Sequence, residues 1–117
     1  MSAKLPNYLR AYRKRAGFSQ ADMAFLLGCR SGAKVSRYEH FSRQPNLKTV
    51  FIYEVVFQVP ARVLFAGMFR DVERTTLQRA QLLARKLDAA KPNPLTARRQ
   101  DALKALSARS IEEIRDP

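Results

Sequence analysis

Residues 19–39 decide the fold, and they read SQADMAFLLGCRSGAKVSRYE. Ser19 and Asp22 fit the capping-box pattern that starts a helix, in which a hydroxyl and a carboxylate satisfy free backbone N–H groups. An apolar stripe at helical spacing follows: Met23, Ala24, Leu26 and Leu27. Gly28 then suits the left-handed end of a helix, and Ser31 suits the cap of a second one. The stretch therefore predicts two short helices joined by a tight turn.

The second predicted helix has one apolar face and one basic face. Val35 and Tyr38 lie three residues apart on the first, and Lys34 and Arg37 lie three apart on the second. Ala24 in the preceding helix is small enough to let the two helices approach closely. A small contact residue, a glycine in the turn and a basic second helix are typical of a helix-turn-helix, whose second helix enters the major groove of DNA.

These residues, together with others in the same order, resemble the XRE family, the lambda-repressor and Cro-like DNA-binding domains. The matching positions are Arg13, residues 17–20, Ala24, Gly28, residues 35–36, residues 38–39 and Pro45. The segment 47–64 resembles the last two helices of the family, so the resemblance covers residues 5–69. It implies an all-α, five-helix domain. The stretch from Gly28 to Glu39 has one residue more than the family pattern, so the turn CRSGAK at residues 29–34 is expected to be longer than in the family.

Composition agrees with a DNA-binding protein. The net charge is +12 and the isoelectric point is about 10.7, which indicates an anionic partner. Residues 1–69 hold 11 basic and 3 acidic residues, whereas residues 70–117 hold 11 and 7, so the first part carries most of the excess. We therefore expect a helix-turn-helix domain over residues 1–69 and a helical C-terminal extension over residues 70–117.

The remaining helices are expected at residues 5–16, 47–58, 61–68, 71–90 and 95–114. Pro6 is tolerated in the first turn of the helix at 5–16, whose core face is expected to be Leu5, Tyr8 or Leu9, Tyr12 and Ala16. A short heptad-like seam is expected in the helix at 71–90: Leu77, Ala80, Ala84 and Leu87. Thr96 is a possible cap for the last helix, in which Ala102, Leu103 and Leu106 are expected to face inward. The segment VFIYEVVFQV at 50–59 favours a strand by propensity alone, but its place in the resemblance predicts a helix. Glu54 within it is expected at the edge of the core or beside an arginine.

The resemblance and the basic helix together predict the DNA contacts. Arg37 and Lys34 suit guanine edges or phosphates, and Gln20 matches the family glutamine that hydrogen-bonds phosphate at a helix N-terminus. Further candidates are Arg30, Ser31, Ser36 and Arg43. The alternative for each is a solvated surface residue. The resemblance also implies a partly buried structural salt bridge between Arg13 and Glu39.

Other classes of protein find little support in the sequence. A single cysteine, Cys29, excludes an internal disulfide, and no cluster of zinc ligands accompanies it or the lone His40. There is no acid–base pair, no nucleophile with a histidine and no phosphate-binding glycine loop, so we expect neither an enzyme nor a cofactor. No apolar run approaches the ~18 residues of a membrane span and no signal peptide is evident. A cytoplasmic, nucleoid-associated protein without a small-molecule effector is expected.

Two functions remain open. The first is a sequence-specific transcriptional regulator, a repressor, that binds double-stranded DNA as a homodimer. The second is an antitoxin-like or adaptor module that uses the same fold to bind protein. Because helix 47–58 is apolar nearly all round, we expect the extension to cover it and to build the dimer interface through Leu77, Leu83 and Leu87. Packing of the extension within one chain is the alternative.

Overall fold

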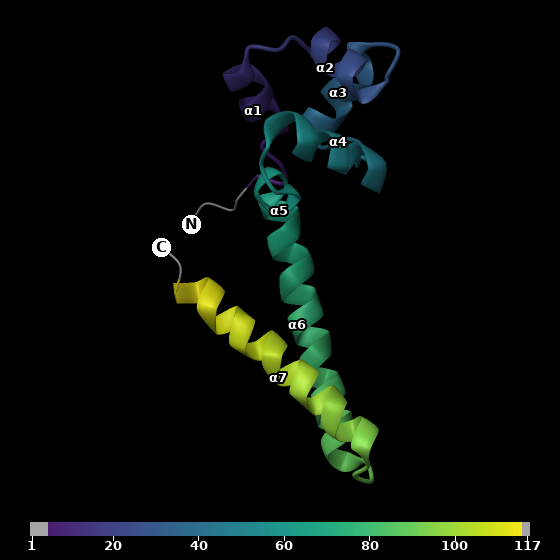
Figure 1. Ribbon diagram of the computed structural model, residues 1–117, viewed down its shortest axis with the longest axis vertical. Coiled ribbons are helices and arrows are strands. Elements are labelled where there is room, and N and C mark those ends of the chain that lie inside the picture. Colours follow the sequence, from purple (N-terminus) through teal and green to yellow (C-terminus); the bar gives the residue numbers. More distant parts are fainter. Residues whose placement is uncertain (1–4, 116–117) are drawn as a thin grey trace. The chain divides into compact units, whose positions relative to one another are not determined.

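A computed structural model describes the backbone of residues 5–115 and the side chains of residues 5–108, and the described chain is all-helical without strands (Figure 1). The all-α class predicted from the sequence is confirmed. The helices are α1 (Leu9–Ala16), α2 (Gln20–Leu27), α3 (Gly32–Glu39), α4 (Leu47–Phe57), α5 (Ala61–Leu64), α6 (Ala66–Ala89) and α7 (Pro94–Arg115). The chain divides into two compact units, residues 1–70 and residues 71–117.

The first helix begins later than predicted. α1 starts at Leu9 rather than Leu5, because Asn7 organises its N-terminus. The Asn7 Oδ1 accepts a hydrogen bond from the Leu9 N–H at 3.1 Å, and its Nδ2 donates to the Tyr38 carbonyl at 3.0 Å. The expected core face is also corrected, since Leu5 and Ala16 are exposed while Leu9 is fully buried.

Residues 5–8 lie outside α1 and form backbone hydrogen bonds with residues 64–68. The Tyr8 N–H donates to the Leu64 carbonyl at 2.8 Å, and the Gly67 N–H donates to the Leu5 carbonyl at 3.0 Å. The Met68 N–H donates to the Pro6 carbonyl at 3.3 Å.

The predicted ends of α2 and α3 are confirmed. The Ser19 Oγ accepts from the Asp22 N–H at 2.9 Å and the Asp22 carboxylate accepts from the Ser19 N–H at 2.9 Å, which lowers the pKa of Asp22. Gly28 closes α2 with φ of +76°. The Ser31 Oγ accepts from the Ala33 N–H at 3.4 Å at the start of α3.

The first unit encloses a continuous apolar core. Its buried members are Leu9, Met23, Ala24, Leu27, Val35, Tyr38, Tyr53, Leu64 and Phe65. Half-buried Cys29 packs against this cluster as a small residue at the edge of the core. Leu26 is 41% exposed and does not belong to the apolar stripe in which the sequence placed it.

α4 is a helix despite its strand-like composition. The Asn46 Oδ1 caps it by accepting from the Thr49 N–H at 2.9 Å, and its side facing the core carries the fully buried Tyr53. The opposite side exposes a row at helical spacing: Leu47, Phe51 and Val55. Glu54 takes a role that the sequence did not indicate, since its Oε1 accepts from the Ala61 N–H at 2.9 Å and caps α5.

The boundary between the last two helices of the first unit differs from the prediction. The expected helix at 61–68 stops at Leu64, and the long helix begins at Ala66 instead of Asp71. The reason is that the N-terminal segment satisfies N–H groups in the first turn of α6, which every helix start leaves without partners. α6 therefore runs from the first unit into the second.

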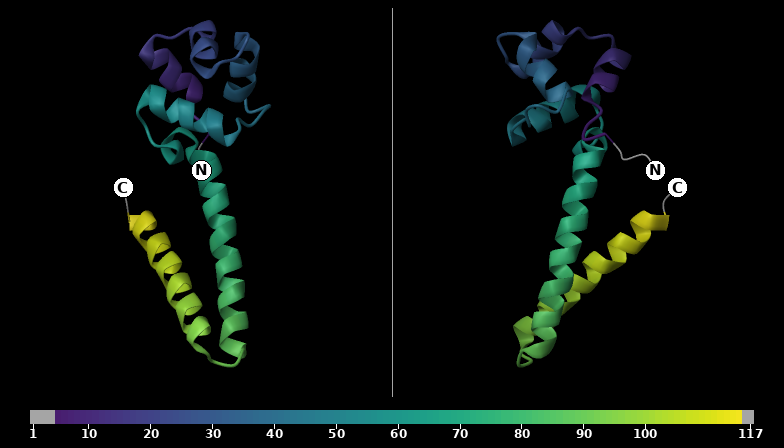
Figure 2. Two further views of the ribbon diagram at one scale, coloured as in Figure 1. Left: turned by 45° about the vertical axis from the view of Figure 1, so that its right-hand side comes forward. Right: turned by 180° about the vertical axis from the view of Figure 1, so that it is seen from behind.

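The second unit is an antiparallel hairpin of α6 and α7 (Figure 2). The Asn93 Oδ1 accepts from the Thr96 N–H at 2.9 Å, so Asn93 is the cap and the prediction of Thr96 was wrong. Along the predicted seam, Leu87 is buried. The other seam residues of α6 are half-buried: Leu77, Ala80 and Ala84.

Two further predictions about the hairpin need correction. Ala102 was expected to face inward with Leu103 and Leu106, but it is exposed while the other two are half-buried. Leu87 was expected in a dimer interface. It retains only 6% exposure within its own chain, because the hairpin already covers it. Leu83, at 43% exposure, remains accessible.

Candidate nucleic-acid interface

α2 and α3 meet at their N-terminal ends without a side chain between them. A Cβ atom added to Gly32, the first residue of α3, would lie 3.1 Å from the Cβ of Gln20, the first residue of α2. A larger residue at position 32 would therefore require Gln20 to shift by a few tenths of an ångström. The two helices are joined by residues 28–31 alone, so the turn is shorter than the six residues CRSGAK suggested, and Gly32 and Ala33 belong to the helix.

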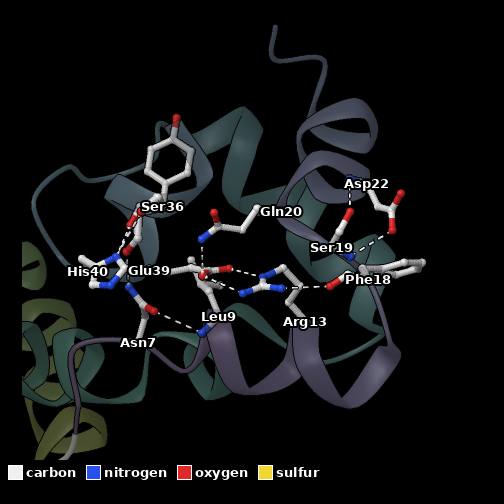
Figure 3. A network of polar contacts seen from close by, with 11 residues as sticks. Asn7, Leu9, Arg13, Phe18, Ser19, Gln20, Asp22, Ser36, Glu39 and His40 are labelled. Carbon is white, nitrogen blue, oxygen red and sulfur yellow. Dashed lines mark hydrogen bonds and ion pairs between the residues drawn. The ribbon is translucent and has the colours of Figure 1, made fainter. Parts of the chain in front are cut away.

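A buried ion pair lies beneath this helix pair (Figure 3). The Arg13 Nε lies 2.6 Å from the Glu39 Oε2, and Arg13 Nη2 donates to the Glu39 Oε1 at 3.2 Å. Arg13 Nη1 donates to the Phe18 carbonyl at 2.9 Å. The two side chains are 9% and 1% exposed, and the hydrogen bond to Glu39 raises the pKa of Arg13. The contact joins α1, the start of α2 and the end of α3, as the resemblance implied.

Gln20 is tied into the same network. Its Nε2 donates to the Glu39 Oε1 at 3.2 Å, and its side chain is half-buried (Figure 3). An amide nitrogen carries two hydrogens, so one of them remains for a phosphate. Gln20 thus has a structural contact that the sequence did not reveal, in addition to its predicted role.

The exposed face of α3 carries the predicted contact residues unequally. Val35, Tyr38 and Glu39 are buried, which fixes the orientation of the helix. Arg37 lies on the opposite, exposed side together with Ala33. Lys34 and Ser36 are half-buried, at the two edges of this face. Arg37 is therefore the long basic side chain that α3 presents most directly.

The remaining candidates lie on both sides of α3. Arg30 is exposed in the turn before the helix, and Arg43 is exposed in the loop after it. Ser31 is also exposed, but its hydroxyl already serves the N-cap of α3. The turn and α3 thus bring together five of the seven predicted contacts, while Gln20 belongs to α2 and Arg43 to the following loop.

Two residues at the end of α3 were not predicted as contacts. His40 is exposed, and its Nδ1 lies 2.8 Å from the Ser36 carbonyl and 3.3 Å from the Ser36 Oγ. The spacing of four residues between Ser36 and His40 is the signal that places them on one face. Phe41 follows with φ of +66° and 46% exposure, a backbone conformation that is rare for an aromatic residue.

Neither a metal site nor a membrane span is found in the part of the chain that the structure describes. No group of three or more His, Cys, Asp or Glu residues there could hold a metal ion. None of the described helices is long and apolar enough to cross a membrane.

Comparisons with known proteins give no match: no protein-family model, no curated protein and no solved structure is significantly similar to this chain.

Proposed function

We propose that residues 5–69 form a helix-turn-helix module of the lambda-repressor and Cro-like type, and that the protein is a sequence-specific DNA-binding regulator of transcription, acting as a repressor in the cytoplasm. α3 would enter the major groove, with α2 lying across the backbone. The exposed face of α3, with Arg37 at its centre and Arg30 before it, is the observation that carries this proposal.

The polar network supports the proposal because it holds this face in one orientation. Glu39 at the C-terminal end of α3 is bonded to α1 through Arg13 and to α2 through Gln20. Direct readout of base edges requires side chains that are presented from a rigid element. The high positive charge of the first part of the chain would supply the phosphate attraction common to all DNA sequences.

Selection from a random pool of DNA duplexes with the purified full-length protein tests the proposal directly. A regulator of this kind should enrich one sequence motif, and its affinity for that motif should exceed its affinity for mixed sequence by ~10³-fold or more. Enrichment of no motif would contradict the proposed function.

Arg37→Ala tests the orientation of α3. Loss of a base contact should cost about 1–3 kcal/mol of binding free energy and relax the selected motif at one position. Arg62→Ala, which removes an exposed arginine from α5, is the matched control and should leave the motif unchanged. An unchanged motif and affinity in the Arg37 variant would rule out this residue as a base contact.

We also propose that the protein binds DNA as a homodimer, since two half-sites multiply a weak single contact. Of the three residues expected in the interface, Leu83 is exposed and Leu77 is half-buried, whereas Leu87 is already covered. Light scattering on the wild type and on Leu83→Glu tests this role. A Leu83→Glu protein as dimeric as the wild type would exclude Leu83 from the interface.

The exposed row on α4 favours a second candidate function, an antitoxin-like or adaptor module. Leu47, Phe51 and Val55 are 67%, 55% and 72% exposed, and such a row along one helix side is a surface on which a protein partner docks. Phe51→Ser separates the two functions. If the variant loses a protein partner and selects the same DNA motif, the adaptor function is favoured. If it keeps the partner and its DNA motif changes, the regulator function is favoured.

A further inference from the structure

Positive charge is concentrated at one end of the C-terminal hairpin. The interval from Arg79 to Lys104 contains seven basic residues and two acidic ones. The flanking sequence is different, because residues 71–78 hold two acidic and one basic residue and residues 105–117 hold three and two. We call the seven basic residues the basic tip: Arg79, Arg85, Lys86, Lys91, Arg98, Arg99 and Lys104.

All seven side chains of the basic tip are exposed. The two acidic residues of the interval are Asp88 and Asp101, and the Oδ1 of Asp88 accepts a hydrogen bond from the Gln100 side chain at 3.2 Å. The hollow between α6 and α7 is lined by Ala80, Ala84 and Leu103 together with polar residues, among them Asp88, Gln100 and Lys104. Apart from Lys104, the members of the basic tip lie outside this hollow and are exposed to solvent.

Part of this charge lies near the N-terminal end of α7. Lys91 precedes the N-terminus of α7, and Arg98 and Arg99 lie in its second turn. The N-terminal end of a helix carries positive partial charge, so anions stabilise it and cations do not. The first turn of α7 contains no acidic residue to compensate. The N-terminal end of α7 therefore does not attract Lys91, and Arg98 and Arg99 lie beyond the first turn, where the influence of the helix dipole ends.

The composition of the hairpin separates the possible polyanions. Residues 70–117 contain no Phe, Tyr or Trp. Proteins that hold single-stranded nucleic acid stack its bases on aromatic side chains. A basic surface without aromatic residues suits the phosphates of a duplex, which are contacted by charge alone.

We propose that the basic tip of the α6–α7 hairpin is a second DNA-binding surface, which contacts the phosphate backbone of double-stranded DNA without reading its sequence. This inference rests on the proposed function only in the choice of duplex DNA as the polyanion. It assigns to the hairpin a role separate from sequence readout by α3 and separate from dimerisation.

The test compares two triple variants of the full-length chain with equal loss of charge. One replaces Lys91, Arg98 and Arg99 with Gln in the basic tip, and the control replaces Arg10, Arg62 and Arg70, which are exposed in the first unit. Binding to a short duplex of mixed sequence is measured by fluorescence anisotropy over a series of salt concentrations. The logarithm of the binding constant should depend less steeply on that of salt by about 0.9 for each lost phosphate contact.

We expect the tip variant to lose about 2–3 units of this slope and on the order of 10-fold or more in affinity at low salt, while the control loses much less. Equal losses in both variants would overturn the inference, since net charge alone would then explain binding. Tighter binding to single-stranded DNA, or to vesicles of anionic phospholipid, than to the duplex would overturn it as well.

Two further measurements keep the outcome separate from that of the proposed function. The tip variant should select the same motif from a random pool as the wild type, because α3 is unchanged. If the wild type selects no motif, the proposed function fails, but the slope comparison still decides the role of the tip. If the triple variant unfolds, Lys91→Gln alone, between the two helices, should remove about one contact from the slope.

Discussion

The two units of the chain are both helical, but they are stabilised differently. The helices of the first unit between Leu9 and Leu64 have 4 to 11 residues, whereas α6 and α7 have 24 and 22. Isolated helices below ~12–15 residues are marginal in water, so the short helices depend on their shared core. Between residues 71 and 108, Leu87 and Thr96 are the only buried residues. The comparison shows that helical content alone does not indicate whether a helix is stabilised by a tertiary core or by its own length.

The core of the first unit is built around aromatic rings. The rings of Tyr38 and Tyr53 meet edge to face with centroids 6.4 Å apart, and those of Tyr53 and Phe57 lie 5.9 Å apart. Such pairs contribute about 0.5–1.5 kcal/mol beyond their buried area. Residues 70–117 contain no aromatic residue, so the packing of the second unit rests on aliphatic and small side chains. The same type of substitution should therefore change the free energy of unfolding by different amounts in the two units.

The largest expected difference in stability between the two units concerns their ion pairs. The first unit holds Arg13–Glu39, with side chains 9% and 1% exposed, and α6 holds Arg74–Asp71, with side chains 68% and 75% exposed. Glu39→Ala should lower the free energy of unfolding by about 3–5 kcal/mol, because it leaves the buried Arg13 charge without the carboxylate that neutralises it. Urea denaturation followed by circular dichroism measures the loss.

Asp71→Ala is the matched control for the exposed pair. It should change the free energy of unfolding by less than about 1 kcal/mol, since solvent screens exposed charges. Similar small losses in both variants would mean that the Arg13–Glu39 contact is open to water in solution.

Truncating a buried leucine tests the second difference. Leu64→Ala in the first unit should cost about 2–5 kcal/mol and destabilise the whole core, because Leu64 is fully buried. Leu87→Ala should act locally, since the hairpin is a separate compact unit. Hydrogen exchange of backbone amides should then accelerate in α7 but not in α2 or α3. Equal acceleration in both units would contradict their independence.

Tyr53→Phe should increase stability by about 1 kcal/mol. The Tyr53 hydroxyl is fully buried and has no hydrogen-bond partner among the described residues, so it is desolvated without compensation. Thermal denaturation of the variant beside Tyr12→Phe, whose ring is only half-buried, measures the difference. A lower melting temperature for Tyr53→Phe would indicate that the hydroxyl is bonded in solution.

The same residue should make the wild type sensitive to alkali. Burial raises the pKa of Tyr53, so the folded state keeps this proton more tightly than the unfolded chain does. The stability that Tyr53 contributes is present below the unfolded tyrosine pKa of about 10 and is lost as the pH rises toward the folded pKa. The advantage of Tyr53→Phe over the wild type should accordingly grow above about pH 10.

Two helix ends in the first unit should show the smallest effects, with opposite signs. Gln58 ends α4 with φ of +55° and Gly17 ends α1 with φ of +84°. Gln58→Gly should raise the free energy of unfolding by up to about 1 kcal/mol, and Gly17→Ala should lower it by a similar amount, because only glycine adopts this conformation without strain. Changes of the same sign in both variants would contradict this explanation.

The polar part of the candidate site shows where sequence reasoning stopped. The resemblance paired Arg13 with Glu39, and the structure contains that contact. The third partner, Gln20, was assigned to solvent and phosphate because nothing in its own helix indicates that Glu39 lies within 3.2 Å. Glu54 was missed for the same reason, since its partner is the backbone of the next helix.

Local chemistry was determined by the sequence itself. The caps of α2 and α3 and the ends at Gly17 and Gly28 follow from residues within three positions of each boundary, where hydroxyl, carboxylate and glycine act on the adjacent backbone. The net charge was also determined by the sequence, because it depends on composition alone. The all-helical class followed from these signals and from the resemblance.

Tertiary structure alone decided what depends on distant partners. α1 begins at Leu9 because Asn7 bonds to Tyr38, and α6 begins at Ala66 because residues 5 and 6 accept hydrogen bonds from its first turn. α4 exposes Phe51 and Val55 because the core has room for only one of its sides. Each outcome joins segments that are far apart in the chain, and the free energy of burying or bonding them depends on a neighbour that local sequence does not specify.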